Sequence, residues 1–238
     1  MLNCFIGRRE TGKTTLAMYG ARAGAPRRLV FDPSDRIFSR AGLKAYDLDE
    51  LTAAYAALDD GDTPEVIYTP RAEGIALGFH EFSDLVYLHT TAHRSRNLAV
   101  VIDESALVQD AIEDPESPMS KAMTWSERRR VHFFLTCHQP KDIPTRKRAI
   151  TDYLVFFHTT QEHDLKVIRE RCSEAFADRV SKLKPYRFLI WDDQRGAEKA
   201  ARLEPRDWKI DLSPRDDAPP PAEKFSPPVI DRGALWRS

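Results

Sequence analysis

Residues 2–15 read Leu-Asn-Cys-Phe-Ile-Gly-Arg-Arg-Glu-Thr-Gly-Lys-Thr-Thr, and this stretch decides the fold. Its apolar start is short enough for a buried strand, and apolar side chains after Thr15 recur with helical spacing. Between the two lies the pattern G-x-x-x-x-G-K-[ST], in the strand–loop–helix context of a phosphate-binding loop. The alternative is a glycine turn that merely begins a helix.

The residue types of this loop suit a bound anion. Glycines let successive backbone N–H groups point inward, and the start of the helix adds partial positive charge. Lys13 is expected to reach the outer phosphates of a nucleotide, and the hydroxyl of Thr14 to hold Mg²⁺. The expected nucleotide-binding residues are Gly7, Arg8, Arg9, Glu10, Thr11, Gly12, Lys13, Thr14 and Thr15.

Length and composition indicate a globular α/β protein. A chain of 238 residues can bury a sizeable core, as one large domain or two small ones. Its net charge of -1 provides no attraction of the whole molecule to nucleic acid or to a membrane surface. Three widely spaced cysteines indicate reduced thiols of a cytosolic protein, and no apolar stretch is long enough to span a membrane.

A second decisive stretch, residues 98–104, reads Leu-Ala-Val-Val-Ile-Asp-Glu. A continuous apolar run predicts a strand that is buried on both faces, as in parallel sheets, and two acids follow it. Ligands bind at this end of the strands in open α/β sheets. Asp103 is therefore expected to assist Mg²⁺ binding indirectly, behind the direct ligands or through a water molecule, and Glu104 to polarise an attacking water. Alternatively, the two acids merely end a strand at the surface.

Strand and helix patterns alternate along about 200 residues, which predicts one mainly parallel sheet with helices on both faces. Further strands are expected at 28–32, 66–69, 131–136 and 153–158, and helices at 47–58, 81–97, 123–130 and 162–172. A closing hairpin is expected from 186–191 and 200–203. Residues 1–212 would form the ATPase domain, and six prolines in residues 213–238 predict an extended tail.

Three features favour a hydrolase over other nucleotide-binding proteins. Glu104, directly after the Mg²⁺ carboxylate, suits water activation. If the strand 131–136 lies between the strands of residues 2–6 and 98–102, Gln139 faces the γ-phosphate of ATP. Arg128 or Arg129, just before that strand, is expected to act in the site of a neighbouring subunit; the alternative is a solvated helix end.

Residues 7–15, residues 98–104 and residues 128–166 resemble the FtsK-HerA superfamily of DNA-pumping ATPases, and most closely the genome-packaging ATPases of membrane-containing double-stranded DNA viruses. The resemblance implies a RecA-like core, ATP hydrolysis with Mg²⁺ and a hexameric ring. It also implies double-stranded DNA and a capsid vertex as partners, and a location in the host cytoplasm or virion without a membrane span. His138 interrupts the family's Thr-Gln strand ending, so the register of the sensor glutamine is open by one residue.

Two other functions remain open at the level of sequence: a small-molecule kinase, or an assembly protein similar to the morphogenesis ATPases of filamentous phages. DNA contacts are not assigned. Two basic stretches are candidates, or are simply solvated surface: Lys141 with Arg146, Lys147 and Arg148, and Arg94 with Arg96.

Overall fold

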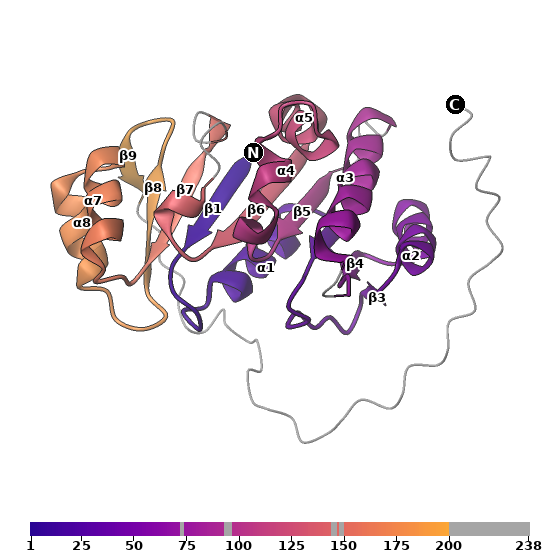
Figure 1. Cartoon of the computed structure of the whole chain (residues 1–238), viewed down its shortest axis with the longest axis horizontal. Helices are drawn as coiled ribbons and strands as arrows, with labels where there is room; N and C mark the ends of the chain where they lie inside the picture. Colours follow the sequence, from indigo (N-terminus) through magenta and orange to yellow (C-terminus); the bar gives the residue numbers. More distant parts are fainter. Residues whose placement is uncertain (72–73, 93–96, 144–146, 148–149, 200–238) are drawn as a thin grey trace, which may run out of the picture. The chain divides into compact units, whose positions relative to one another are not determined.

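The computed structural model describes residues 1–71, 74–92, 97–143, 147 and 150–199. These residues form a nine-stranded sheet in the order β3-β4-β2-β5-β6-β1-β7-β8-β9 (Figure 1). The strands are β1 Leu2–Ile6, β2 Arg27–Phe31, β3 Leu43–Ala45, β4 Glu65–Tyr68, β5 Leu98–Ile102, β6 Val131–Cys137, β7 Tyr153–Phe157, β8 Phe188–Asp192 and β9 Ala197–Lys199.

Helices connect the strands. They are α1 Lys13–Gly24, α2 Leu48–Asp60, α3 Ile75–Ala92, α4 Gln109–Glu113, α5 Pro118–Thr124, α6 Ser126–Arg129, α7 Glu162–Arg171 and α8 Glu174–Ser181, with short 3₁₀ turns η2 Ser105–Val108 and η3 Pro140–Asp142. Capping residues determine where these helices begin and end. In α2, the Asp47 carboxylate accepts the N–H of Glu50 at the start, and Gly61, with a φ of 92°, ends the helix.

The strands from β3 to β7 run parallel, and β8 and β9 pair antiparallel at one edge of the sheet. Alternate residues of the central strands enter one large apolar cluster together with side chains of α2, α3, α5, α7 and α8. The opposite face carries α1, where Gly20 lies so close to the ring of Phe134 that a Cβ would come within 2.9 Å. Helices therefore cover both faces, as predicted, in a RecA-like α/β arrangement.

Strand β6 lies between β1 and β5, with Cys4 level with Leu135 and Val100 level with Phe133. This is the order on which the expectation for Gln139 depended. The carboxyl ends of all three strands meet at one edge of the sheet. The phosphate loop, the acid pair and the end of β6 are thereby brought together from three distant parts of the chain.

Several element predictions need correction. Residues 43–45 and 174–181 form β3 and α8, which the sequence did not indicate, and α3 begins at Ile75 instead of residue 81. The single helix expected at 123–130 is two short helices, because the chain turns at Trp125. The hairpin exists, but its second strand is Ala197–Lys199; residues 200–203, the boundary at 212 and the tail lie outside the described residues.

Where the structure describes the chain, no helix has the length and apolar character that a membrane span requires. Cys4 and Cys137 are buried, Cys172 is half-buried, and all three are free thiols, as the sequence predicted.

Candidate functional site

The phosphate loop joins β1 to α1 and depends on a close approach and on unusual backbone angles. A Cβ on Gly7 would lie 2.7 Å from the Cβ of Phe157, so only glycine lets the loop pass the end of β7. Glu10 and Gly12 adopt φ values of 60° and 95°. Such left-handed residues turn consecutive N–H groups toward a common point, which is how backbone loops bind anions.

The Lys13 side chain lies within the loop, with only 7% of the residue exposed. Its ammonium donates to the backbone carbonyl of Arg8 at 2.7 Å, which also accepts the hydroxyl of Thr11 at 2.9 Å. Burial lowers the pKa of Lys13, while the charges of Asp103 and Glu104 oppose this effect. A buried ammonium with one backbone acceptor is well placed to exchange that acceptor for a phosphate oxygen.

Two hydroxyls converge on Asp103, the first acid after β5. Thr14 Oγ1 donates to Asp103 Oδ1 at 2.7 Å, and Thr136 Oγ1 donates to the same oxygen at 2.6 Å. Hydroxyl and carboxylate oxygens are the ligands that Mg²⁺ prefers, so Thr14 and Asp103 fit the metal expected from the sequence. Thr136, from the end of β6, is a member of this group that the sequence did not identify.

Glu104 has a backbone conformation that directs its side chain out of the strand. Its φ is 49° and its ψ is 49°, in the left-handed region that few non-glycine residues adopt. The Glu104 N–H donates to Thr136 Oγ1 at 3.0 Å, so the same hydroxyl bridges both acids. The Glu104 Oε1 lies 3.9 Å from Nε2 of His138.

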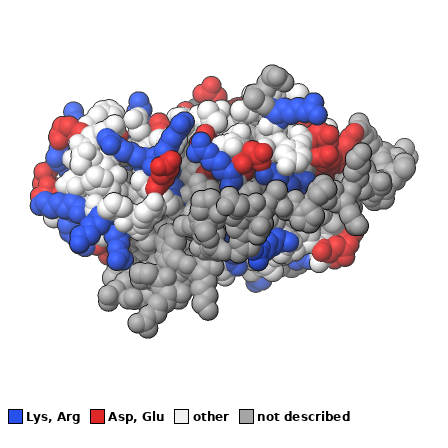
Figure 2. Space-filling model, turned by 90° about the horizontal axis from the view of Figure 1, so that it is seen from below, with Lys and Arg blue, Asp and Glu red and all other residues white. Residues whose placement is uncertain are grey.

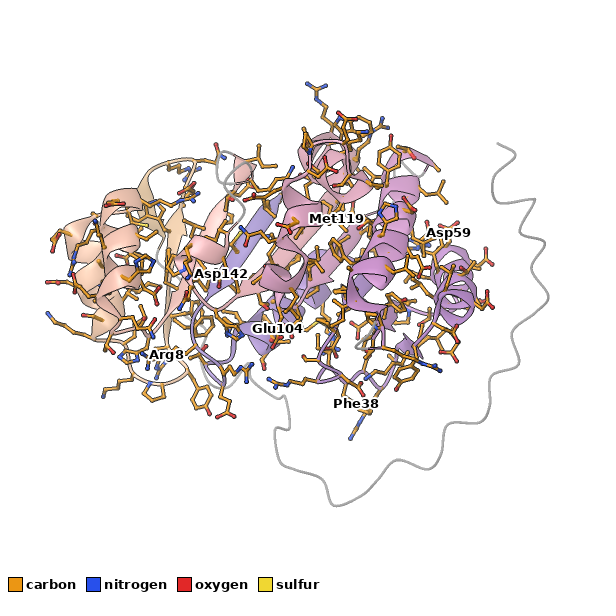
Figure 3. The ribbon with its side chains drawn as sticks, viewed as in Figure 1. Arg8, Phe38, Asp59, Glu104, Met119 and Asp142 are labelled. Carbon is orange, nitrogen blue, oxygen red and sulfur yellow. The ribbon has the colours of Figure 1, made fainter. Side chains whose placement is uncertain are left out.

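These residues surround a cavity of about 260 Å³ at the carboxyl edge of the sheet. Arg8, Glu104 and Phe38, which follow β1, β5 and β2, lie along this same end (Figure 3). The expected site residues that line the cavity are Arg9, Glu10, Thr11, Gly12, Lys13, Thr14, Thr15, Asp103 and Glu104, and those that the sequence did not assign to the site are Arg36, Thr136, Cys137 and His138.

Arg36 reaches the cavity from the loop after β2. The fully buried carboxylate of Asp32 shapes this loop by accepting the N–H of Ile37 at 2.6 Å and the hydroxyl of Ser34 at 3.2 Å. Burial raises the pKa of Asp32, and the charge of nearby Asp103 adds to the rise. The sequence contained a signal for this loop. Asp32 is an acid that directly follows a buried parallel strand, and Asp103 has the same position after β5.

Three residues that were expected near the bound phosphates do not line the cavity: Gly7, Arg8 and Gln139. Gly7 acts through the close approach described above. Arg8 is exposed, and its charge helps to oppose the pKa rise that burial causes in Asp164 on α7. The role predicted for Gln139 stays a prediction, because the chain turns into η3 at this point and the Gln139 N–H donates to the Asp142 carboxylate at 2.9 Å.

Arg128 and Arg129 lie in α6, before the start of β6 and therefore at the amino end of that strand. The cavity is at the carboxyl end of the same strand. Arg128 is exposed and Arg129 half-buried. Their position is compatible with a site on another molecule and incompatible with direct contact to a nucleotide in their own cavity.

The candidate DNA contacts are only partly described. Lys147 is 4% exposed and donates to Ser120 Oγ at 2.7 Å and to the Ser120 carbonyl at 3.2 Å, so it is not a surface cation. Lys141 is exposed, whereas Arg94, Arg96, Arg146 and Arg148 lie outside the described residues. Figure 2 shows basic and acidic side chains interspersed over the described part of one face.

The chain is similar to known proteins in its structure but not detectably in its sequence. No family model matches the chain. A search of curated proteins finds no match either.

Among solved structures, the genome packaging NTPase B204 from Sulfolobus turreted icosahedral virus 2, in complex with AMPPCP, has 19% sequence identity and a TM-score of 0.65, over 85% of this chain and 98% of that one. Its complex with AMP has a TM-score of 0.66 at 18% identity, over 84% and 96% of the two chains. VirB4 of Thermoanaerobacter pseudethanolicus has 9% identity and a TM-score of 0.60, over 86% and 90%. The chain thus has the RecA-like P-loop NTPase fold of a viral genome-packaging NTPase, which confirms at the level of fold the resemblance seen in its sequence.

Proposed function

We propose that this protein is a Mg²⁺-dependent ATPase that works as an oligomeric ring and moves double-stranded DNA into a viral capsid. The observation that carries the proposal is the contact of Thr14 with Asp103 at 2.7 Å, beside Lys13 and Glu104 in one cavity. A phosphate-binding lysine, a metal-binding pair and a carboxylate base are the parts that hydrolysis of a nucleoside triphosphate requires. The structurally similar B204 has been solved in complex with AMP, AMPPCP and ATP-gammaS, which supports nucleotide binding by this fold.

In the proposed reaction, Glu104 accepts a proton from a water molecule in the cavity. The water oxygen forms a bond to the γ-phosphorus, the bond from that phosphorus to the β–γ bridging oxygen breaks, and ADP and phosphate result. Lys13 moves from the Arg8 carbonyl to the phosphates and balances their charge. Backbone N–H groups of residues 9–13 hold the phosphates in place.

Thr14 and Asp103 are the residues that would hold Mg²⁺. The Thr14 hydroxyl would contact the metal, and Asp103, which accepts that hydroxyl at 2.7 Å, would assist through it or through water. The metal, when bound, neutralises charge on the β- and γ-phosphates. Asp103 is kept in position by Thr136, because the hydroxyl at 2.6 Å fixes the carboxylate even before any ligand binds.

A ring would complete the site. Arg128, with Arg129 next to it, lies at the end of the sheet opposite the cavity, and we propose that it contacts the nucleotide of a neighbouring subunit. Such an arginine contributes about 10³ to 10⁵ in rate where it has been measured. DNA would be held through its phosphates rather than its bases, in the host cytoplasm or at the packaging vertex of the capsid.

The decisive test is ATP hydrolysis by the purified chain with and without double-stranded DNA. Glu104→Gln should lose at least about 100-fold in kcat while still binding ATP, because a general base contributes about 10² to 10⁴. Asp110→Asn, which removes an exposed acid six residues further along, is the matched control and should hydrolyse like the parent. Full activity of Glu104→Gln would overturn the mechanism, as would activity that persists in EDTA.

Mixed rings test the arginine. Arg128→Ala and Lys13→Ala subunits should each be inactive alone and should regain some activity when mixed, because one intact interface then forms between them. A control mixture keeps the Lys13→Ala subunits and uses Lys121→Ala subunits in place of the Arg128→Ala subunits. No recovery at any mixing ratio would refute an arginine that acts between subunits.

A mass measurement with nucleotide and DNA distinguishes the motor from the kinase alternative. A ring that assembles on DNA supports the motor. A monomer that transfers phosphate to a small molecule would support the kinase instead.

A further inference from the structure

The end of β6 offers two candidates for the residue that works beside Glu104. Thr136, near the end of β6, points to Asp103 and Glu104. His138 is the first residue after the strand, and its Nε2 lies 3.9 Å from Glu104 Oε1. The cavity lining includes Thr136, Cys137 and His138 but not Gln139.

The next residue is held elsewhere. The Gln139 N–H is bonded to Asp142 at 2.9 Å, and the Asp142 N–H returns to the Gln139 carbonyl at 3.0 Å. These reciprocal bonds close η3 directly after β6. A one-residue change of register, which would bring Gln139 into the cavity, requires both bonds to break.

We propose that His138 is the positioning residue for Glu104. This assignment rests on the proposed ATP hydrolysis and adds to it the residue that orients the base. The Glu104 backbone is already fixed by Thr136, and the carboxylate lies 3.9 Å from His138 Nε2. About 1 Å of side-chain movement brings the pair to hydrogen-bond distance.

His138 acts on the orientation of the carboxylate and not on nucleotide affinity. The imidazole, with its hydrogen on Nε2, donates to one oxygen of Glu104 and leaves the other to accept the proton of the water. Without the ring, the carboxylate can rotate about its side-chain bonds in a cavity that leaves 20% of it exposed. Loss of orientation in a general base is expressed in kcat, because it affects the transition state more than the bound ground state.

The test separates kcat from the KM for ATP in the 238-residue chain. His138→Ala should lower kcat about 10- to 100-fold and leave the KM for ATP within about twofold. His138→Gln keeps an N–H donor of similar reach and should recover most of that loss. Gln139→Ala tests the rival position and should lower kcat less than His138→Ala does. His163→Ala, which removes an exposed histidine on α7, is the control and should remain within about twofold of the parent.

Each outcome is informative. A large loss of kcat in Gln139→Ala, with His138→Ala close to the parent, would assign the role to Gln139 and overturn the proposal. An equal change of KM and kcat in His138→Ala, without recovery in His138→Gln, would indicate a packing role and also overturn it. Thermal unfolding checks that the variants fold. If the parent chain hydrolyses no ATP, the proposed function fails and this assignment fails with it. If the parent hydrolyses ATP, the variants test the role of His138 alone.

Discussion

Replacing Thr136 by valine should reveal how strongly one hydroxyl organises the site. Valine keeps the shape of threonine but removes two hydrogen bonds, to Asp103 Oδ1 at 2.6 Å and from the Glu104 N–H at 3.0 Å, at a residue that is 1% exposed. A bond to a charged group contributes about 1.5 to 3 kcal/mol and a neutral one about 1 kcal/mol. We therefore expect Thr136→Val to lower the free energy of unfolding by about 3 kcal/mol.

For a domain of about 200 residues this loss corresponds to a decrease in Tm of about 6 to 12 °C. Urea unfolding followed by circular dichroism measures the free energy, and calorimetry measures the Tm. Thr136→Ser is the matched control, because it keeps the hydroxyl and loses only a buried methyl group, at about 1 kcal/mol. A valine variant at least as stable as the serine variant would show that the two hydrogen bonds do not stabilise the fold, and the reasoning would be wrong.

Three further predictions concern other parts of the structure. Gly7→Ala should reduce stability by about 1 to 3 kcal/mol and weaken ATP binding, because the new methyl group would overlap Phe157; urea unfolding and nucleotide titration measure the two effects. Arg36→Ala should raise the KM for ATP about 10-fold, with a smaller change in Arg36→Lys, because a cation that lines the cavity is lost; an unchanged KM would exclude contact with the nucleotide. Burial raises the pKa of the Cys4 thiol to about 12, so at pH 8 its reaction with a disulfide reagent should be at least about a thousandfold slower in the folded chain than in urea; fast reaction of the folded chain would contradict its burial.

The sequence predicted the central fold because its strongest patterns are local. Apolar runs such as residues 98–102 and 133–135 indicate strands buried on both faces, and the structure confirms both strands. The strand β3 was missed because it has only three residues, of which Leu43 and Lys44 are half-buried. The break between α5 and α6 was missed since no glycine or proline marks the turn at Trp125.

Part of the cavity lining was also predictable from the sequence, because motif spacing is a local signal. Motif spacing identified Lys13, Thr14 and the acid pair, and the structure brings them together. Thr136 and Asp32 could have been found from their places at the ends of buried strands, whereas the position of Arg36 depends on how Asp32 folds the following loop. The burial of Lys147 against Ser120 is likewise a tertiary contact, invisible in a run of basic residues.

The position of β6 has a consequence for how a ring could coordinate its subunits. This strand has Arg128 and Arg129 before its amino end and Thr136 and His138 at its carboxyl end, about 20 Å away. Hydrogen bonds to β1 and β5 on either side prevent it from bending or shortening. If the arginine contacts the neighbour's nucleotide, one rigid strand joins two successive ATP sites. A shift of β6 at one site would then also move the arginine at the next, without a separate signalling element.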